Sequence, residues 1–173
     1  MKDAAAPDWL PDLIECDWNR FQETVERAHA IFLRDFGRQE SRPSFRGKRM
    51  GLKRHPEIEG KSATFWHFVT EGAVEVSRTP DRARLERIAW PRAIIVEAGA
   101  AQSRVLVWQT ERRRADHKKA VRWTIALPDF SYVVIVDDRE EYVLPWTAYS
   151  VAEAHQRRKL EKDYNAWVAS QKS

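Results

Sequence analysis

The sequence predicts an α+β fold, in which N-terminal helices pack on an antiparallel sheet of four or slightly more strands and a C-terminal helix closes the chain. Apolar residues recur at helical spacing over residues 17–36 and again over residues 151–168. Between them, from residue 104 onward, short apolar runs alternate with polar residues and are separated by turn residues. These patterns indicate helices outside and a sheet within the second half.

Length and composition indicate one globular unit. The chain has 173 residues, 43% of them hydrophobic, with eight tryptophans, which is enough for a substantial core. We expect residues 1–40 to form an N-terminal arm and helix, and residues 41–173 to form the main part of a single compact domain. The net charge of +4 is compatible with a nucleic-acid partner, although many ordinary basic proteins share it.

Cysteine usage and the N-terminus bear on location. Cys16 is the single cysteine, so no intramolecular disulfide forms, which fits a reducing compartment or a protein that does not use disulfides. The N-terminus is polar, and no run is apolar or long enough to cross a bilayer. No Cys/His spacing is typical of zinc sites. We therefore expect a cytoplasmic protein with no membrane partner, no metal and no other cofactor.

The N-terminal half contains the helical patterns. Asp17 is placed to cap a helix that runs to about Phe36, and Gly37 is a good stop. The apolar run 63–71 fits either a strand or a helical turn. Proline at the first position makes Thr79-Pro80 the expected start of a further helix, which should pause at Pro91.

A basic segment follows the first helix. Residues 38–61 are rich in arginine, lysine, glycine and proline and hold a short candidate strand at 45–52. One interpretation is a solvated loop. The other is an arm that follows an RNA backbone, and its candidate phosphate contacts are Arg46, Lys48, Arg49, Lys53 and Arg54.

The sheet pattern begins with a strand at 105–110 and continues with strands at 121–127, 132–136 and 142–149. A basic loop separates the first two strands. Side chains two apart in a strand share a face, so Thr147 and Tyr149 should project together while Trp146 and Ala148 point to the core. Threonine and tyrosine are also simply good strand formers.

A helix start follows this strand. Ser150 and Glu153 have the spacing of a capping box, so the last helix should begin there and present its N-terminus beside Thr147 and Tyr149. Exposed amide groups and the helix dipole favour phosphate at such a point.

RNA cleavage without a metal needs a general base, a general acid and cations around the phosphate. Histidine suits the first two roles because its ordinary pKa is near neutrality. Of five histidines, His67 is the best candidate, since it lies between Trp66 and Phe68 and must reach either a satisfied pocket or a cleft. Glu71 would orient it if the segment is helical. His155 is the second choice.

Arginines provide candidate phosphate ligands. Arg84 and Arg87 share a helix face at i and i+3, and Arg122 shares the polar face of a central strand with Thr124. Planar guanidinium groups match phosphate oxygens. The alternative is that each forms a salt bridge with one of the 26 acidic residues.

Four segments resemble the barnase–EndoU–colicin–RelE (BECR) nuclease superfamily, and in particular its phage- and prophage-associated branch, whose members occur in toxin and conflict systems. These segments are F-W-H-F-V-T-E-G (65–72), R-A-R-L-E-R-I-A-W (82–90), R-W-T-I-A-L-P (122–128) and Y-V-L-P-W-T-A-Y-S-V (142–151). The resemblance spans roughly residues 45–168. It implies an active site of His67, Arg84 or Arg87, Thr147 and Tyr149.

These observations predict a metal-independent, toxin-like endoribonuclease that gives 2′,3′-cyclic phosphate and 5′-hydroxyl ends. His67 would be general base or acid, Arg84 or Arg87 would neutralise charge, Thr147 would bind a phosphate oxygen, and Tyr149 would donate a hydrogen bond or stack on a base. RNA would be the partner, and a cognate inhibitor or antitoxin protein a possible second one. The alternative is a non-catalytic nucleic-acid-binding or phage accessory protein of the same fold.

Overall fold

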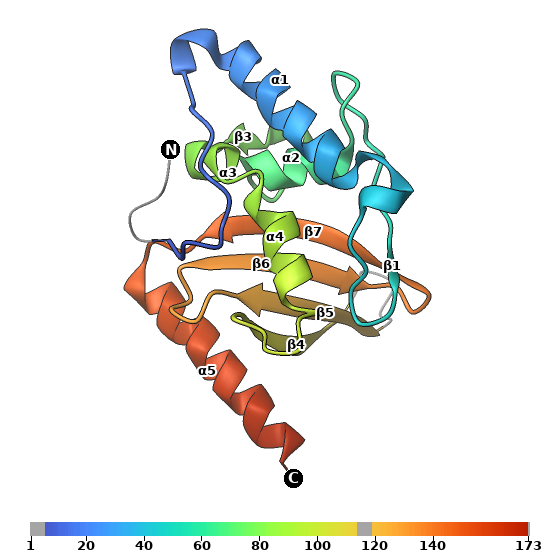
Figure 1. Ribbon diagram of the computed structural model, residues 1–173, viewed down its shortest axis with the longest axis vertical. Helices are drawn as coiled ribbons and strands as arrows, with labels where there is room; N and C mark the ends of the chain where they lie inside the picture. The colour runs from blue at the N-terminus through green and yellow to red at the C-terminus, as the bar shows by residue number, and fades with distance from the viewer. Residues whose placement is uncertain (1–5, 114–118, 173) are drawn as a thin grey trace.

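The computed structural model describes residues 6–113 and 119–172, and it has an α+β architecture (Figure 1). The first helical segment matches the expected one. It begins with a 3₁₀ turn, η1 (Trp18–Arg20), continues as α1 (Phe21–Phe32) and ends in a π-helical turn, η2 (Leu33–Gly37). The Asp17 carboxylate accepts a hydrogen bond from the backbone N–H of Asn19 at 2.9 Å, which caps this start.

The apolar run at 63–71 is a helix, α2 (Ala63–Val69). The side chain of Ser62 accepts a hydrogen bond from the N–H of Phe65 and so acts as its N-cap. A short 3₁₀ turn, η3 (Gln39–Ser41), and the two-residue strand β1 (Arg49–Met50) lie between η2 and α2. The candidate strand at 45–52 is therefore reduced to β1 and a bridge between Phe45 and Lys48.

The prediction that Thr79-Pro80 starts a helix is wrong. These residues form β3 (Thr79–Pro80), which pairs with β2 (Thr70–Glu71) around the 3₁₀ turn η4 (Glu75–Ser77). Helix α3 (Arg82–Glu86) begins two residues after Pro80, and the Asp81 carboxylate caps it by accepting the N–H of Arg84 at 2.8 Å. Helix α4 (Trp90–Glu97) follows, with Pro91 in its first turn.

The main sheet has five strands in the order β1-β7-β6-β5-β4. Four of them form the expected antiparallel meander, namely β4 (Leu106–Arg113), β5 (Lys119–Ala126), β6 (Tyr132–Asp138) and β7 (Tyr142–Ser150). The prediction of a wholly antiparallel sheet is wrong at one edge, because β1 pairs parallel with the start of β7. Part of the basic loop predicted between β4 and β5, residues 114–118, falls outside the described residues.

The two faces of the sheet have separate cores. On one face, α1 to α4 bury a large cluster against the strands, with Phe32, Phe65 and Ile94 packed near Ile125 and Val134. Figure 1 shows α4 lying across this face and α1, α2 and α3 gathered beside the β7 edge. On the other face, Trp108, Phe130 and Val133 pack with residues of the last helix.

The last helix, α5 (Ala154–Gln171), starts later than predicted, and the Ser150 capping box is wrong. Ser150 is still paired with Tyr132 in the sheet, so its backbone is extended and its side chain cannot cap. Its hydroxyl oxygen is buried without a hydrogen-bond partner. In the described part of the chain, no helix is long and apolar enough to cross a membrane.

Candidate functional site

A groove with a volume of about 690 Å³ lies between α5 and the open part of the sheet. The groove exists because α5 covers only part of this face. In the covered part, the centre of the Tyr164 ring lies 5.7 Å from the centre of the Trp108 ring. The strands contribute a row of outward side chains, and α5 contributes one stripe from the facing side. Lining residues from the strands are Trp108, Thr110, Glu111, Arg122, Thr124, Ile135, Trp146, Thr147 and Tyr149; those from α5 are Gln156, Lys159, Leu160 and Asp163.

The strand register explains which side chains reach the groove. Thr124 pairs with Ile135, which pairs with Thr147, so these three point to the same face. Thr147 and Tyr149 therefore project together, as predicted. Between Ile135 and Val136 the register shifts, and Trp146 is the extra residue of this β-bulge. The prediction that Trp146 points to the core is wrong, because the bulge turns its half-buried ring to the groove wall.

Three of the predicted residues form one hydrogen-bonded cluster at the β7 edge. The hydroxyl of Thr147 donates to the carbonyl oxygen of His67 at 3.0 Å. The Nη1 of Arg84 donates to Thr147 Oγ1 at 2.9 Å and to the same His67 carbonyl at 3.1 Å. The Arg84 guanidinium also lies 5.3 Å from the centre of the Tyr149 ring. Residues more than 60 positions apart in the chain thus meet because α2 and α3 pack along the uncovered edge of β7.

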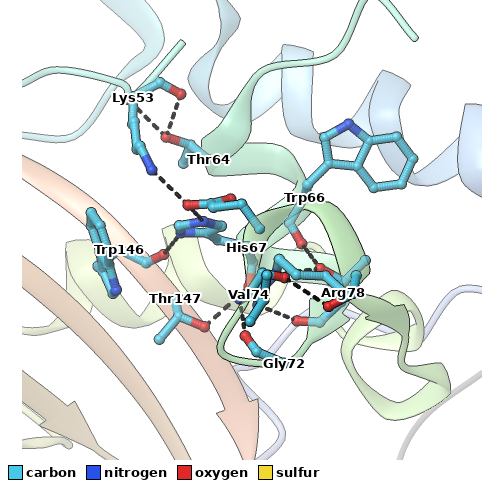
Figure 2. Close-up of polar contacts among 12 residues, drawn as sticks. Lys53, Thr64, Trp66, His67, Gly72, Val74, Arg78, Trp146 and Thr147 are labelled. Atoms are coloured by element: carbon cyan, nitrogen blue, oxygen red, sulfur yellow. Dashed lines mark hydrogen bonds and ion pairs between the residues drawn. The ribbon is translucent and has the colours of Figure 1, made fainter. Parts of the chain in front are cut away.

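The ring of His67 is engaged on both sides (Figure 2). Its Nδ1 lies 3.2 Å from the carbonyl oxygen of Trp146, and its Nε2 lies 2.8 Å from Oε1 of Glu75. A carbonyl oxygen can only accept, so Nδ1 carries a hydrogen and donates it. The same Glu75 oxygen accepts a hydrogen bond from Lys53 Nζ at 2.7 Å. His67 is buried, and it ties β7 to the η4 turn from behind the groove wall.

Burial shifts the pKa of two side chains at this site. It lowers the pKa of His67, and the hydrogen bond and charge of Glu75 oppose that change without cancelling it. Burial also raises the pKa of Tyr149, against the opposing charge of Arg84. The phenol of Tyr149 therefore stays protonated near neutral pH. None of the described residues forms a hydrogen bond with its hydroxyl, so the O–H is available as a donor in the groove.

Two cations lie close to the ring of Trp146. The guanidinium of Arg122 is 5.0 Å from the centre of the Trp146 ring, and Lys53 Nζ is 5.2 Å from it. Arg122 is held by its Nε, which donates to Asp137 Oδ1 at 2.5 Å. Across the groove, Lys159 of α5 is exposed. The guanidinium of Arg122 beside the Trp146 ring is a combination that suits a phosphate linked to a nucleobase.

Other predicted residues lie elsewhere. Arg87 has its guanidinium 5.0 Å from the centre of the Trp90 ring and lines a separate pocket with Ser131 and Arg157. Arg84, and not Arg87, thus accompanies Thr147. His155 is exposed on the first turn of α5.

The basic arm is held mostly by protein contacts. Arg46 covers the ring of Trp123 at 4.1 Å, and Lys48 forms an ion pair with Asp138 at 2.6 Å. Arg49 lies 5.8 Å from the centre of the Tyr142 ring. Lys53 approaches the groove through Trp146, and Arg54 is exposed. The arm therefore contacts the β1 end of the sheet, and its nearest approach to the groove is Lys53, beside the ring of Trp146.

Several groove residues were not predicted, although the sequence contains a pattern that indicates them. Proline within a strand marks an edge or a bulge, so Pro145 could have indicated that Trp146 leaves the regular alternation. Gln156, Lys159 and Asp163 recur at helical spacing and so share one face of α5 with Leu160. Glu75, which binds His67, had no sequence signal.

Among the described residues, no group of three or more histidine, cysteine, aspartate or glutamate side chains is arranged to hold a metal ion. Comparison of the chain with protein-family models, curated proteins and solved structures finds no match.

Proposed function

We propose that this protein is a metal-independent endoribonuclease that binds single-stranded RNA in the groove between the sheet and α5. The observation that carries the proposal is the collection of a guanidinium, aromatic rings and a free phenol on one face, from Arg122, Trp146 and Tyr149. Single-stranded RNA is recognised by such combinations, because phosphates pair with cations and unpaired bases stack on aromatic rings.

The reaction is an intramolecular transfer. The 2′-oxygen attacks the adjacent phosphorus, the bond from phosphorus to the 5′-oxygen breaks, and the products are a 2′,3′-cyclic phosphate and a 5′-hydroxyl. A base removes the proton of the 2′-hydroxyl, and an acid protonates the leaving 5′-oxygen. Arg122 and Lys159 would balance the charge on the phosphate, with Arg84 supporting Thr147 and Tyr149 from behind the wall.

Tyr149 is the proposed hydrogen-bond donor to the phosphate or the leaving oxygen, since its O–H is free and its pKa is raised by burial. His67 is the proposed base or acid, but its Nε2 must first leave Glu75 to reach a substrate. Asp163 and Glu111 also line the groove, and their carboxylates offer an alternative base. Thr147 would position the phosphate.

Membership of the BECR nuclease superfamily, in its phage- and prophage-associated branch, is part of the proposal. Its support is the four-stranded meander β4 to β7 with α1 to α4 on one face, and the clustering of Arg84, Thr147 and Tyr149 with the backbone carbonyl of His67. A cytoplasmic toxin role and a cognate inhibitor protein follow from that membership. In this scheme residues 41–173 form the nuclease part and residues 1–40 an added arm and helix.

The test is cleavage of a short single-stranded RNA in EDTA, with product ends identified by mass spectrometry. Wild type should give 2′,3′-cyclic phosphate ends. Tyr149→Phe should slow cleavage by a factor on the order of 10² if the phenol acts as an acid. Arg122→Gln should weaken both binding and cleavage. Arg158→Gln is the matched control, because Arg158 is exposed on α5 and does not line the groove. Absence of cleavage by wild type would refute nuclease activity.

A second candidate is a non-catalytic nucleic-acid-binding or phage accessory protein. It is favoured by one observation, that the Thr147 hydroxyl and both ring nitrogens of His67 are already bonded within the protein. This candidate predicts RNA binding without cleavage. Fluorescence anisotropy across a salt series measures the binding.

The same salt series tests the basic arm. A variant with glutamine at Arg46, Lys48, Arg49, Lys53 and Arg54 should flatten the log–log salt slope by about one unit per lost phosphate contact. An unchanged slope would remove the arm from the interface.

A further inference from the structure

The guanidinium of Arg122 lines the groove while a buried carboxylate holds its Nε. Arg122 on β5 and Asp137 on β6 are directly opposite each other in the sheet, so their side chains lie on the same face. Nε of Arg122 donates to Asp137 Oδ1 at 2.5 Å. The side chain of Asp137 is 8% exposed and does not belong to the groove lining. Asp137 therefore holds Arg122 from a position that leaves the groove itself open.

The two terminal amino groups of Arg122 remain for a ligand. Among residues 6–113 and 119–172, no group accepts a hydrogen bond from Nη1 or Nη2 of this side chain. Its guanidinium carbon lies 5.0 Å from the centre of the Trp146 ring, which lines the same groove. A guanidinium whose Nε is engaged still presents two amino groups in one plane, and this geometry matches two oxygens of a phosphate.

A second arginine shares the carboxylate. Oδ2 of Asp137 accepts a hydrogen bond from Arg139 Nη2 at 3.2 Å. One carboxylate thus faces two guanidinium groups, which leaves one positive charge on the three side chains together. They are 8–26% exposed, so water screens this charge less than it would at an open surface. The carboxylates of the groove lining, Glu111 and Asp163, come from β4 and α5, and in the described part of the chain Arg122 is paired with neither. An anion bound at Arg122 would balance the remaining charge.

Asp137 has two opposite effects on such an anion. Its negative charge repels a phosphate, and Arg139 offsets that repulsion. Its hydrogen bond restricts the side chain of Arg122 before any ligand arrives. Ordering one long side chain on binding lowers affinity about two- to tenfold, and a side chain that is already held avoids that loss.

We propose that Asp137 is a positioning residue, which orients the guanidinium of Arg122 so that Nη1 and Nη2 bind one phosphate of the strand in the groove, and that Arg139 keeps this site positive. The inference rests on the proposed function in one respect, namely that the ligand of the groove is single-stranded RNA. It does not depend on cleavage, because the contact acts in binding.

The sign of one effect tests this role. If Asp137 acted through its charge alone, Asp137→Ala would bind an anionic strand more tightly than wild type. A positioning role gives the opposite result, and Asp137→Ala should bind about two- to tenfold more weakly. The measurement is fluorescence anisotropy with a labelled single-stranded RNA whose 2′-oxygens are methylated, so that they cannot attack phosphorus. Glu141→Ala is the matched control, because Glu141 is an exposed carboxylate of the same hairpin and its loss should leave binding as in wild type.

Two variants of Arg122 show whether the effect of Asp137 passes through it. Arg122→Gln should weaken binding about ten- to hundredfold, because charged donors to the phosphate are lost. Adding Asp137→Ala to Arg122→Gln should then cause no further loss, since the group that Asp137 orients is absent. Arg122→Lys keeps the positive charge and a partner for Asp137, yet it should bind about tenfold more weakly than wild type, because one ammonium group cannot serve both the carboxylate and two phosphate oxygens.

The outcomes separate this role from the proposed function. If Arg122→Gln binds as wild type does, the groove is not the RNA site, and both proposals are refuted. If Arg122→Gln binds weakly while Asp137→Ala binds as tightly as wild type or more tightly, the role of Asp137 alone is refuted. Wild-type affinity in Arg122→Lys also refutes that role, and this variant decides the question if Asp137→Ala does not fold.

Discussion

Truncation of His67 should destabilise the fold, and the size of the effect follows from its contacts. The side chain is 4% exposed, and Nδ1 donates to the Trp146 carbonyl at 3.2 Å. In His67→Ala, that carbonyl loses its donor, which costs about 1–3 kcal/mol, and the vacated space adds about 2 kcal/mol. A loss of about 3–5 kcal/mol is a large share of a typical stability of about 5–15 kcal/mol.

Thermal unfolding followed by circular dichroism measures this effect. For a chain of this length, each kcal/mol lowers the Tm by about 2–4 °C, so His67→Ala should melt about 6–20 °C below wild type. His67→Asn should recover part of the loss, because its amide can donate to the same carbonyl. His155→Ala is the control, since His155 is exposed and its loss should leave the Tm unchanged.

The same variants separate structure from catalysis. The rate of RNA cleavage is divided by the concentration of folded protein and is measured at a temperature below the Tm of every variant. If His67→Ala melts within about 2 °C of wild type, the structural reasoning is refuted, and a loss of cleavage in that folded variant would assign His67 to the chemistry. If the Tm falls and cleavage by the folded fraction persists, His67 is a structural residue.

Three further predictions concern stability. Burial lowers the pKa of both His67 and His29, so the unfolded chain binds more protons than the folded chain as the pH falls. The free energy of unfolding should therefore decrease as the pH drops below about 6.5, and it should decrease less in His67→Asn. Thermal melting at pH 7.5 and at pH 5.5 measures this difference. Ser150→Ala should be neutral or stabilising by up to about 1 kcal/mol, because it removes a buried hydroxyl without a partner, and a clear loss in urea unfolding would contradict that. Asp81→Ala should cost about 1 kcal/mol by uncapping α3, and Asp81→Asn should retain most of the stability in the same assay.

The sequence determined the elements whose signals are local. The periodicity of residues 17–36, the alternation of residues 121–127 and the turn at 138–140 each depend on near neighbours, and the structure has a helix, a strand and a hairpin there. The same locality placed Thr147 and Tyr149 on one face. Alternation in a strand needs no knowledge of what the strand packs against.

Local patterns gave wrong predictions for residues that could either start a helix or pair in a strand. Ser150 has the side chain and spacing of an N-cap, yet pairing with Tyr132 holds it in the sheet. Thr79-Pro80 resembles a helix start, yet it pairs with Thr70 and Glu71, and the capping carboxylate is that of Asp81. The cost of losing a strand pairing is set by distant residues, which no window of sequence contains.

Tertiary structure alone decided the surroundings of His67. The sequence indicated a polar residue that needed a satisfied pocket or a cleft, and left both open. The chain brings Glu75 to one ring nitrogen and the Trp146 carbonyl to the other, and the second contact spans 79 positions. It depends on α2 packing at the uncovered β7 edge and on the bulge that turns Trp146 outward. Such packing is a property of the whole core, because the placement of each helix depends on every other surface buried with it.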